Sequence, residues 1–143
     1  MQRAEISALL GGKSVIRGEI ANRMDLIDLG SKGITKDALL RLASYLSMSL
    51  RQIAELLPVT ERTIQRYKRK QRFNRVVSEQ VLQIAEVAAR GGKVFGDRNK
   101  FLLWMRSPSP ALGNRTPASL LHSRFGTEVV LDELGRIEHG VIS

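Results

Sequence analysis

The stretch SLRQIAELLPVTERTIQRYKRKQR, residues 49–72, contains two short helix patterns separated by a Pro-Val-Thr break. In residues 50–57, apolar side chains recur at steps of three and four residues, and Ser49 supplies a hydroxyl that can cap the helix N-terminus. Pro58 ends this pattern because proline cannot continue a helix. The second pattern begins after Thr60, another capping residue, and predicts a helix over 61–70.

The second helix is predicted to be two-faced, because Ile64 and Tyr67 share one side and polar or basic residues occupy the other. The pair of helices resembles a helix-turn-helix motif. A small residue, Ala54, allows the two helices to approach each other, and Ile64 packs the second onto the core. Pro58 stands where the turn usually has glycine, so we expect a different turn geometry.

The charge of the chain is unevenly distributed. The net charge is +9 in total, with 15 Lys/Arg against 7 Asp/Glu in residues 1–77 and 8 against 7 in residues 78–143. Seven of the basic residues fall between positions 62 and 75. Such a density attracts phosphate oxygens, although a solvated basic helix is the plain alternative.

We interpret the basic helix as a DNA-recognition helix. Four residues that share its outer face would read base edges in the major groove: Arg62, Gln65, Arg66 and Arg69. Lys68, Lys70 and Arg72 would mostly hold phosphates. The expected DNA-binding residues are Thr60, Glu61, Arg62, Gln65, Arg66, Lys68, Arg69, Lys70 and Arg72.

Composition argues against several other classes of protein. Cysteine is absent, and two histidines, His122 and His139, cannot build a metal site without carboxylate help, so we expect no metal and no cofactor. No glycine-rich phosphate loop or nucleophile–base set is recognisable, so we expect no enzyme activity. Without a long apolar run or a signal-peptide pattern, we expect a cytoplasmic protein that does not bind membranes.

The flanking sequence also predicts helices, which makes the fold all-α. The pattern predicts helices near 19–29 and over 36–47, and a long helix that Ser78 caps and that continues through Gly91-Gly92 to Phe95.

Three more helices are expected towards the C-terminus. Asp97 caps the first, over 98–106, which buries Phe101, Leu102 and either Trp104 or Met105. Thr116-Pro117 begins the second, over 117–125, and Gly126 ends it. The third runs from Thr127 onward, with its apolar residues at Val130, Leu134, Ile137 and Val141.

Residues 94–141 carry a more specific resemblance. A Phe95-Gly96-Asp97 break is followed by Trp104, by Pro110-Ala111-Leu112-Gly113, by Thr116-Pro117 and by an Arg136-Ile137-Glu138 segment. This order is similar to the toxin-binding domain of the Xre/MbcA/ParS family of antitoxins. Asn114 replaces the family's usual second glycine, and asparagine tolerates left-handed backbone.

The resemblance implies an antitoxin that silences a RES-domain toxin, an NAD-consuming enzyme, and represses its own operon by binding operator DNA. It implies a helix-turn-helix domain over 34–77 and a small helical toxin-binding domain over 78–143. It leaves residues 1–33 unassigned, and the residue pattern predicts that this segment is partly helical. The alternative is a homodimeric helix-turn-helix regulator without a toxin. That alternative does not explain the C-terminal pattern.

The C-terminal tail is the expected toxin contact, because an apolar chain end normally frays unless something covers it. The expected toxin-binding residues are Arg136, Glu138, Val141, Ile142 and Ser143. Alternatively, Arg136 and Glu138 pair with each other and only the aliphatic residues matter. Because one recognition helix reads few base pairs, we also expect a homodimer that makes contact around the helix beginning at Ser78.

Overall fold

The computed structural model describes residues 3–12 and 22–140, and over these residues the all-α prediction is confirmed. The described part has no strands and only two isolated bridges, Thr35 with Arg72 and Ser109 with Arg115. The elements are α1 (Arg3–Leu9), α2 (Arg23–Lys32), α3 (Lys36–Tyr45), α4 (Leu50–Ala54), α5 (Glu61–Arg66), α6 (Arg75–Phe95), α7 (Arg98–Arg106), the 3-10 helices η2 (Pro110–Leu112) and η3 (Pro117–Leu120), and α8 (Arg124–Glu138).

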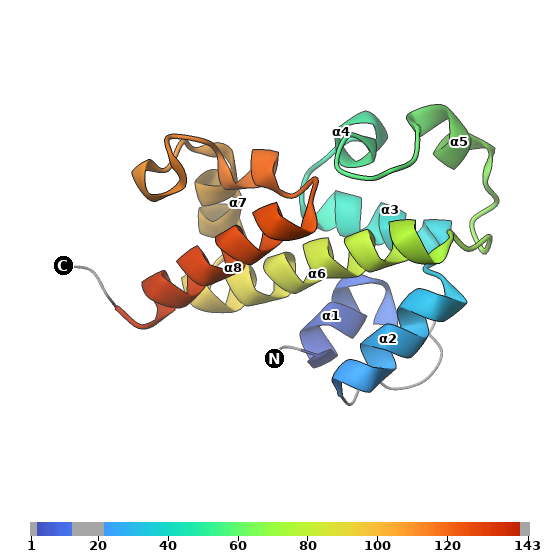
Figure 1. Cartoon of the computed structure of the whole chain (residues 1–143), viewed down its shortest axis with the longest axis horizontal. Helices are drawn as coiled ribbons and strands as arrows, with labels where there is room; N and C mark the ends of the chain where they lie inside the picture. The colour runs from blue at the N-terminus through green and yellow to red at the C-terminus, as the bar shows by residue number, and fades with distance from the viewer. Residues whose placement is uncertain (1–2, 13–21, 141–143) are drawn as a thin grey trace.

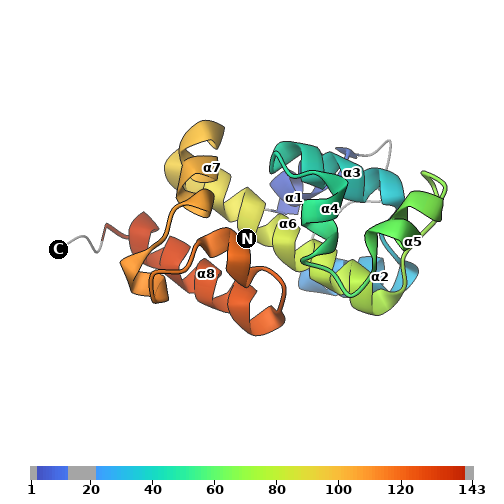
Figure 2. The same ribbon diagram turned by 90° about the horizontal axis from the view of Figure 1, so that it is seen from above.

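Helix α6 is the central axis of an elongated molecule (Figure 1). Helices α1 and α2 pack against α6 on one side, and α7 and α8 pack on its C-terminal part. One continuous core of buried apolar residues joins these elements, from Leu39 in α3 to Leu134 in α8. The view from above places α5 at one end of the long axis and the end of α8 at the other (Figure 2).

The predicted long helix through the two glycines is confirmed as α6. Gly91 is buried, and a Cβ added there would lie 2.0 Å from the ring of Phe101, so the glycine makes room for that ring. The predicted cap at Ser78 is wrong. Asn74 caps α6 by accepting from the Val77 N–H, because the helix begins one turn earlier than its apolar pattern.

Ser78 instead lies inside α6 as a buried polar link. Its hydroxyl accepts a hydrogen bond from the Ile34 N–H at 2.8 Å and lies 3.2 Å from the Phe73 carbonyl, to which it donates. It therefore ties the start of α6 to the segment that precedes α3.

Helices α4 and α5 are shorter than predicted. Helix α4 ends at Ala54 because the next two bonds, from Leu56 N and Leu57 N, are of the tighter i to i+3 type before Pro58. Helix α5 ends at Arg66 instead of residue 70. Tyr67 turns into extended backbone and its ring stacks on Phe73, with centroids 4.9 Å apart.

The predicted helix over 117–125 is wrong, although Thr116 caps its start as expected. Only the single 3-10 turn η3 forms there, and Gly126 lies in the first turn of α8 instead of ending a helix. A Cβ on Gly126 would lie 1.7 Å from the Leu120 carbonyl oxygen, so this glycine allows η3 and α8 to touch. The expected Asp97 cap and the C-terminal helix are confirmed.

The helix expected near 19–29 corresponds to α2, which begins at Arg23, and residues 19–21 lie outside the described part. Helix α1 has no counterpart among the predicted helices. The expected domain boundary between 77 and 78 falls inside α6. Across the described ranges, no helix has both the length and the apolar character that crossing a bilayer requires.

Candidate nucleic-acid and toxin interfaces

Helix α5 presents its polar face to solvent as the sequence predicts. Ile64 is completely buried, Tyr67 is half-buried, and Arg62, Gln65 and Arg66 are exposed. The Thr60 hydroxyl caps the helix by accepting from the Thr63 N–H at 3.1 Å. One side of this short helix is therefore fixed to the core, and the other is free for a ligand.

Residues 67–73, which we call the basic loop, cross the N-terminus of α3. The Gln71 and Arg69 carbonyls accept hydrogen bonds from Lys36 N at 3.0 Å and Asp37 N at 2.8 Å. Phe73 N donates to the Ile34 carbonyl at 2.9 Å. The first backbone N–H groups of a helix have no partner within the helix, so the loop and α3 satisfy each other.

The expected DNA-binding cations divide into two groups in the structure. Arg69 forms an ion pair with Asp37 at 2.8 Å, and Arg72 donates to the Gly33 carbonyl at 2.6 Å. Within the described ranges, no side-chain hydrogen bond or ion pair engages the other four, which are Arg62, Arg66, Lys68 and Lys70. The second group keeps its full charge for an external anion.

Two residues that sequence reasoning missed hold this region in place. Lys36 donates from Nζ to the Tyr67 carbonyl at 2.9 Å and the Gln65 carbonyl at 3.4 Å, so it caps the C-terminal end of α5. Asp37 holds Arg69. Both lie about thirty residues before their partners in the chain, and no local pattern reports such a pairing.

At the other end of the molecule, Arg136 and Glu138 lie in the last turn of α8. The alternative that these two side chains pair with each other is wrong. Arg136 pairs with Glu133 at 2.7 Å, and Glu138 pairs with Arg90 of α6 at 2.8 Å. Residues two apart on a helix point about 200° apart, which explains why they cannot meet. The remaining expected toxin contacts, Val141, Ile142 and Ser143, lie outside the described residues.

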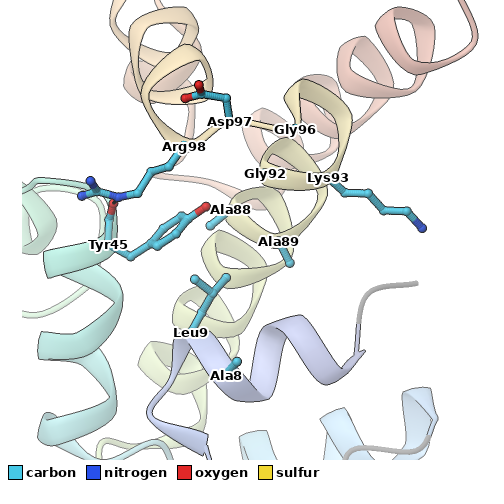
Figure 3. Close-up of a pocket in the computed structure, with 10 residues that line it drawn as sticks. All are labelled: Ala8, Leu9, Tyr45, Ala88, Ala89, Gly92, Lys93, Gly96, Asp97 and Arg98. Atoms are coloured by element: carbon cyan, nitrogen blue, oxygen red, sulfur yellow. Dashed lines mark hydrogen bonds between the residues drawn. The ribbon is translucent and has the colours of Figure 1, made fainter.

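Arg98 of α7 connects the second half of the chain to the C-terminal end of α3. Arg98 donates to the carbonyls of Tyr45 at 2.8 Å and Ser44 at 3.2 Å, and its guanidinium lies 5.4 Å from the Tyr45 ring centroid. Figure 3 shows the Tyr45 ring extending towards α6 beside an open groove of about 530 Å³. Burial raises the pKa of the Tyr45 hydroxyl, while the positive charge of Arg98 opposes that shift.

Two charged groups of this groove, Asp97 and Arg98, already have structural partners. The Asp97 carboxylate caps α7 by accepting from Asn99 N and Lys100 N, and Arg98 caps α3. Among the described residues, no group of three or more histidine or acidic side chains could hold a metal ion. His122 and His139 are exposed, as expected.

Comparison with known proteins identifies both halves. Residues 25–86 match the model of the antitoxin Xre-like helix-turn-helix domain, and residues 90–140 match that of the antitoxin Xre/MbcA/ParS C-terminal toxin-binding domain. Antitoxin Xre of Yersinia enterocolitica serotype O:8 / biotype 1B is 31% identical over 120 residues, which cover 82% of this chain and 81% of that protein. The chain belongs to the Xre/MbcA/ParS antitoxin family.

A second relative agrees with this membership, and a solved structure shares the fold. Antitoxin Xre of Photorhabdus laumondii subsp. laumondii is 35% identical over 75 residues, covering 52% of this chain and 51% of that protein. A chain of the crystal structure of the M. tuberculosis MbcT–MbcA toxin–antitoxin complex has the same fold. It aligns with a TM-score of 0.57 and 20% identity over 76% of this chain and 96% of that chain. This antitoxin therefore has a helix-turn-helix domain and a toxin-binding domain.

Proposed function

We propose that this antitoxin neutralises a RES-domain toxin that degrades NAD, and that it represses its own operon by binding operator DNA. The observation that best supports this proposal is that two unlike surfaces lie at opposite ends of α6. One end presents α5 with the basic loop, and the other presents the last turn of α8 (Figure 1). Each surface can bind one partner without blocking the other.

The exposed face of α5 supports the operator-binding half of the proposal. Arg62, Gln65 and Arg66 are exposed on this face, and the free charges of Lys68 and Lys70 follow it. An arginine that reads guanine contributes about 1–3 kcal/mol of discrimination.

The test of operator binding is a gel-shift titration with Arg66→Ala. We expect a loss of about 1–3 kcal/mol in operator affinity and a relaxed preference at one base pair. Arg115→Ala, at an exposed arginine in the other half, is the control that removes the same charge. A loss below about 1 kcal/mol for Arg66→Ala would exclude direct base reading by this residue.

The toxin-binding domain supports the second half of the proposal. We propose that the last turn of α8 and the following residues pack on the toxin and obstruct the entrance to its NAD pocket. Arg136 keeps 54% of its side-chain surface exposed although it pairs with Glu133, so it is available to a partner. Deleting residues 136–143 should abolish inhibition of NAD consumption and leave operator binding intact. Full inhibition by the truncated protein would move the inhibitory contact to the region from Trp104 to Leu121.

A regulator that acts without a toxin is the competing function. It would use the same α5 surface, but it gives no role to the second domain. Copurification with the product of the adjacent gene separates the two: a RES-domain protein retained by this chain supports the antitoxin function, and no retained protein supports the alternative.

We also propose that the working species is a homodimer, with its contact along α6. A groove of about 250 Å³ lies between α2, α6 and α8. Exposed apolar side chains stand on both flanking helices: Met24, Ile27, Phe125 and Val129. The lining balances two arginines against two glutamates, Arg23, Arg124, Glu79 and Glu86, and a two-fold symmetric contact requires such self-complementarity.

The double variant Ile27→Ser with Phe125→Ser tests this interface. We expect light scattering to report a monomer at micromolar concentration, with weaker operator binding because two half-sites are no longer read together. A variant that remains dimeric would exclude this surface. A monomeric wild-type protein with full operator affinity would exclude the homodimer itself.

A further inference from the structure

The ion pair between Arg90 and Glu138 joins two helices at the toxin-facing end. Its Nη2–Oε1 distance is 2.8 Å, and the two side chains are 31% and 32% exposed. By comparison, the Arg51–Glu55 pair within α4 and its C-cap is 80% and 71% exposed. Partial burial shields the Arg90–Glu138 pair from screening by salt, so it holds its partners more firmly than a surface pair does.

Arg90 packs closely against α8 beside Gly135. A Cβ added to Gly135 would lie 3.5 Å from Arg90 Nη2, an ordinary contact distance. The Nε atom of Arg90 is buried and has no hydrogen-bond partner among the described residues. The Glu138 carboxylate therefore balances the positive charge of the partly desolvated Arg90 guanidinium. Removing this carboxylate would leave that charge without a counter-charge.

The end of α8 has little else to hold it. Its buried residues are Thr127, Val130 and Leu134, and none lies beyond Leu134. A glutamate at a helix C-terminus is also unfavourable for the helix dipole. Glu138 therefore does not stabilise α8 as an isolated helix, and its contribution comes from the contact with α6.

The direction of Arg136 follows from this contact. Because residues two apart on a helix point about 200° apart, fixing Glu138 on α6 turns Arg136 away from α6. Arg136 then faces outward, where its side chain is 54% exposed. The pair thus sets which face the last turn of α8 offers to a partner.

We propose that Arg90 and Glu138 are positioning residues for toxin inhibition, an inference that rests on the proposed function. Arg90 does not touch the toxin. It holds Glu138 on α6, and the fixed last turn presents Arg136 in the orientation that blocks the toxin.

The test uses Arg90→Gln and Glu138→Gln in the full chain, mixed with the toxin. We expect each variant to inhibit NAD consumption about tenfold more weakly, a size typical of a lost coupled contact. Amide hydrogen exchange over residues 136–140 of the free antitoxin should become faster, and operator binding should not change. The charge swap Arg90→Glu with Glu138→Arg should recover inhibition and protection at least in part.

Arg51→Gln is the matched control. It removes the same charge and breaks an exposed pair in the other half of the molecule. Inhibition and exchange over 136–140 should match the wild type. Circular dichroism of every variant checks folding. If Arg90→Gln fails to fold, Glu138→Gln removes the same ion pair and provides the measurement of inhibition and exchange.

Four outcomes would overturn the proposal. If exchange becomes faster while inhibition stays at the wild-type level, the pair is structural only. If inhibition falls with unchanged exchange and no recovery in the swap, Arg90 or Glu138 contacts the toxin directly. If deleting residues 136–143 leaves inhibition intact, the proposed inhibitory element fails and this inference fails with it. If the deletion abolishes inhibition but Arg90→Gln inhibits as well as the wild type, the proposed function stands and only the positioning role of the ion pair is overturned.

Discussion

The two ends of α6 are held in place by different kinds of interaction. At the end that carries α5, backbone hydrogen bonds from Lys36 and Asp37 fix the basic loop, and four of the expected DNA-binding cations have no side-chain partner among the described residues. At the end that carries the last turn of α8, a side-chain ion pair, Arg90 with Glu138, fixes that turn. The first arrangement leaves positive charge unpaired, and the second uses a pair of charges to hold one helix on another. The following predictions test this difference, from the largest expected effect to the smallest.

Gly126→Ala tests whether the toxin-binding domain can be damaged alone. The new Cβ would lie 1.7 Å from the Leu120 carbonyl oxygen, so η3 and α8 must separate. We expect a loss of about 3 kcal/mol in the free energy of unfolding, measured by urea denaturation, at the upper end of overpacking effects. Gly135→Ala in the same helix meets its nearest atom at 3.5 Å and should change stability by less than about 1 kcal/mol.

Because one core connects both ends, Gly126→Ala should unfold in a single transition. Two separate transitions would mean that the ends are independent units, which would contradict the shared core.

The affinities for operator DNA and for the toxin should depend differently on salt concentration. With about four free cations meeting phosphates, operator affinity should fall about 100-fold when salt rises from about 50 to about 200 mM. Toxin affinity should fall less than about tenfold, because residues 78–143 carry almost no net charge. Binding titrations at several salt concentrations give both slopes. Equal slopes would remove the electrostatic distinction between the ends.

Lys36→Met should weaken operator binding by about 1 kcal/mol, because α5 loses the charged cap on its C-terminal carbonyls. Its salt slope should stay that of the wild type. Lys68→Met is the matched control, since it removes a free charge and should lower the slope by about one. A reduced slope for Lys36→Met would mean that Lys36 contacts phosphate itself.

Asp37→Asn should have the smallest effect. The Arg69–Asp37 pair has an arginine that is 71% exposed, so its loss should change stability by less than about 1 kcal/mol. The freed Arg69 and the lost negative charge should tighten operator binding by about twofold to threefold. Weaker operator binding would show that the pair orients the basic loop. The loop would then be held by this side-chain contact as well as by its backbone hydrogen bonds to α3.

Local patterns were sufficient for several elements. The helical spacing of apolar residues continues past Gly91-Gly92, and this predicted the continuous α6. Two residues of low helix propensity do not change that spacing. Thr60 and Asp97 were recognised as caps because capping depends on bonds only two or three residues away. The family pattern over 94–141 predicted the toxin-binding domain.

The errors arise where distant segments meet. No helix-breaking residue at Tyr67 ends α5. The helix ends where Tyr67 stacks on Phe73, six residues later, and where its carbonyl accepts a bond from Lys36, 31 residues earlier. Ser78 has the chemistry of a cap, but Ile34 and Phe73 surround its hydroxyl and Asn74 caps the helix instead. Gly126 has the conformational freedom of a terminator, and its role is to let α8 touch η3.

The sequence by itself determined most of the helices, several of their caps, the basic surface of α5 and the family, because each depends on residues close together in the chain. Only the tertiary structure decided which charges stay free. Asp37 and the Gly33 carbonyl engage Arg69 and Arg72, and Arg90 engages Glu138. The physical reason is that an ion pair or a backbone cap forms between groups that folding brings within about 3 Å, and separations of 32 to 48 residues leave no periodic trace in the sequence.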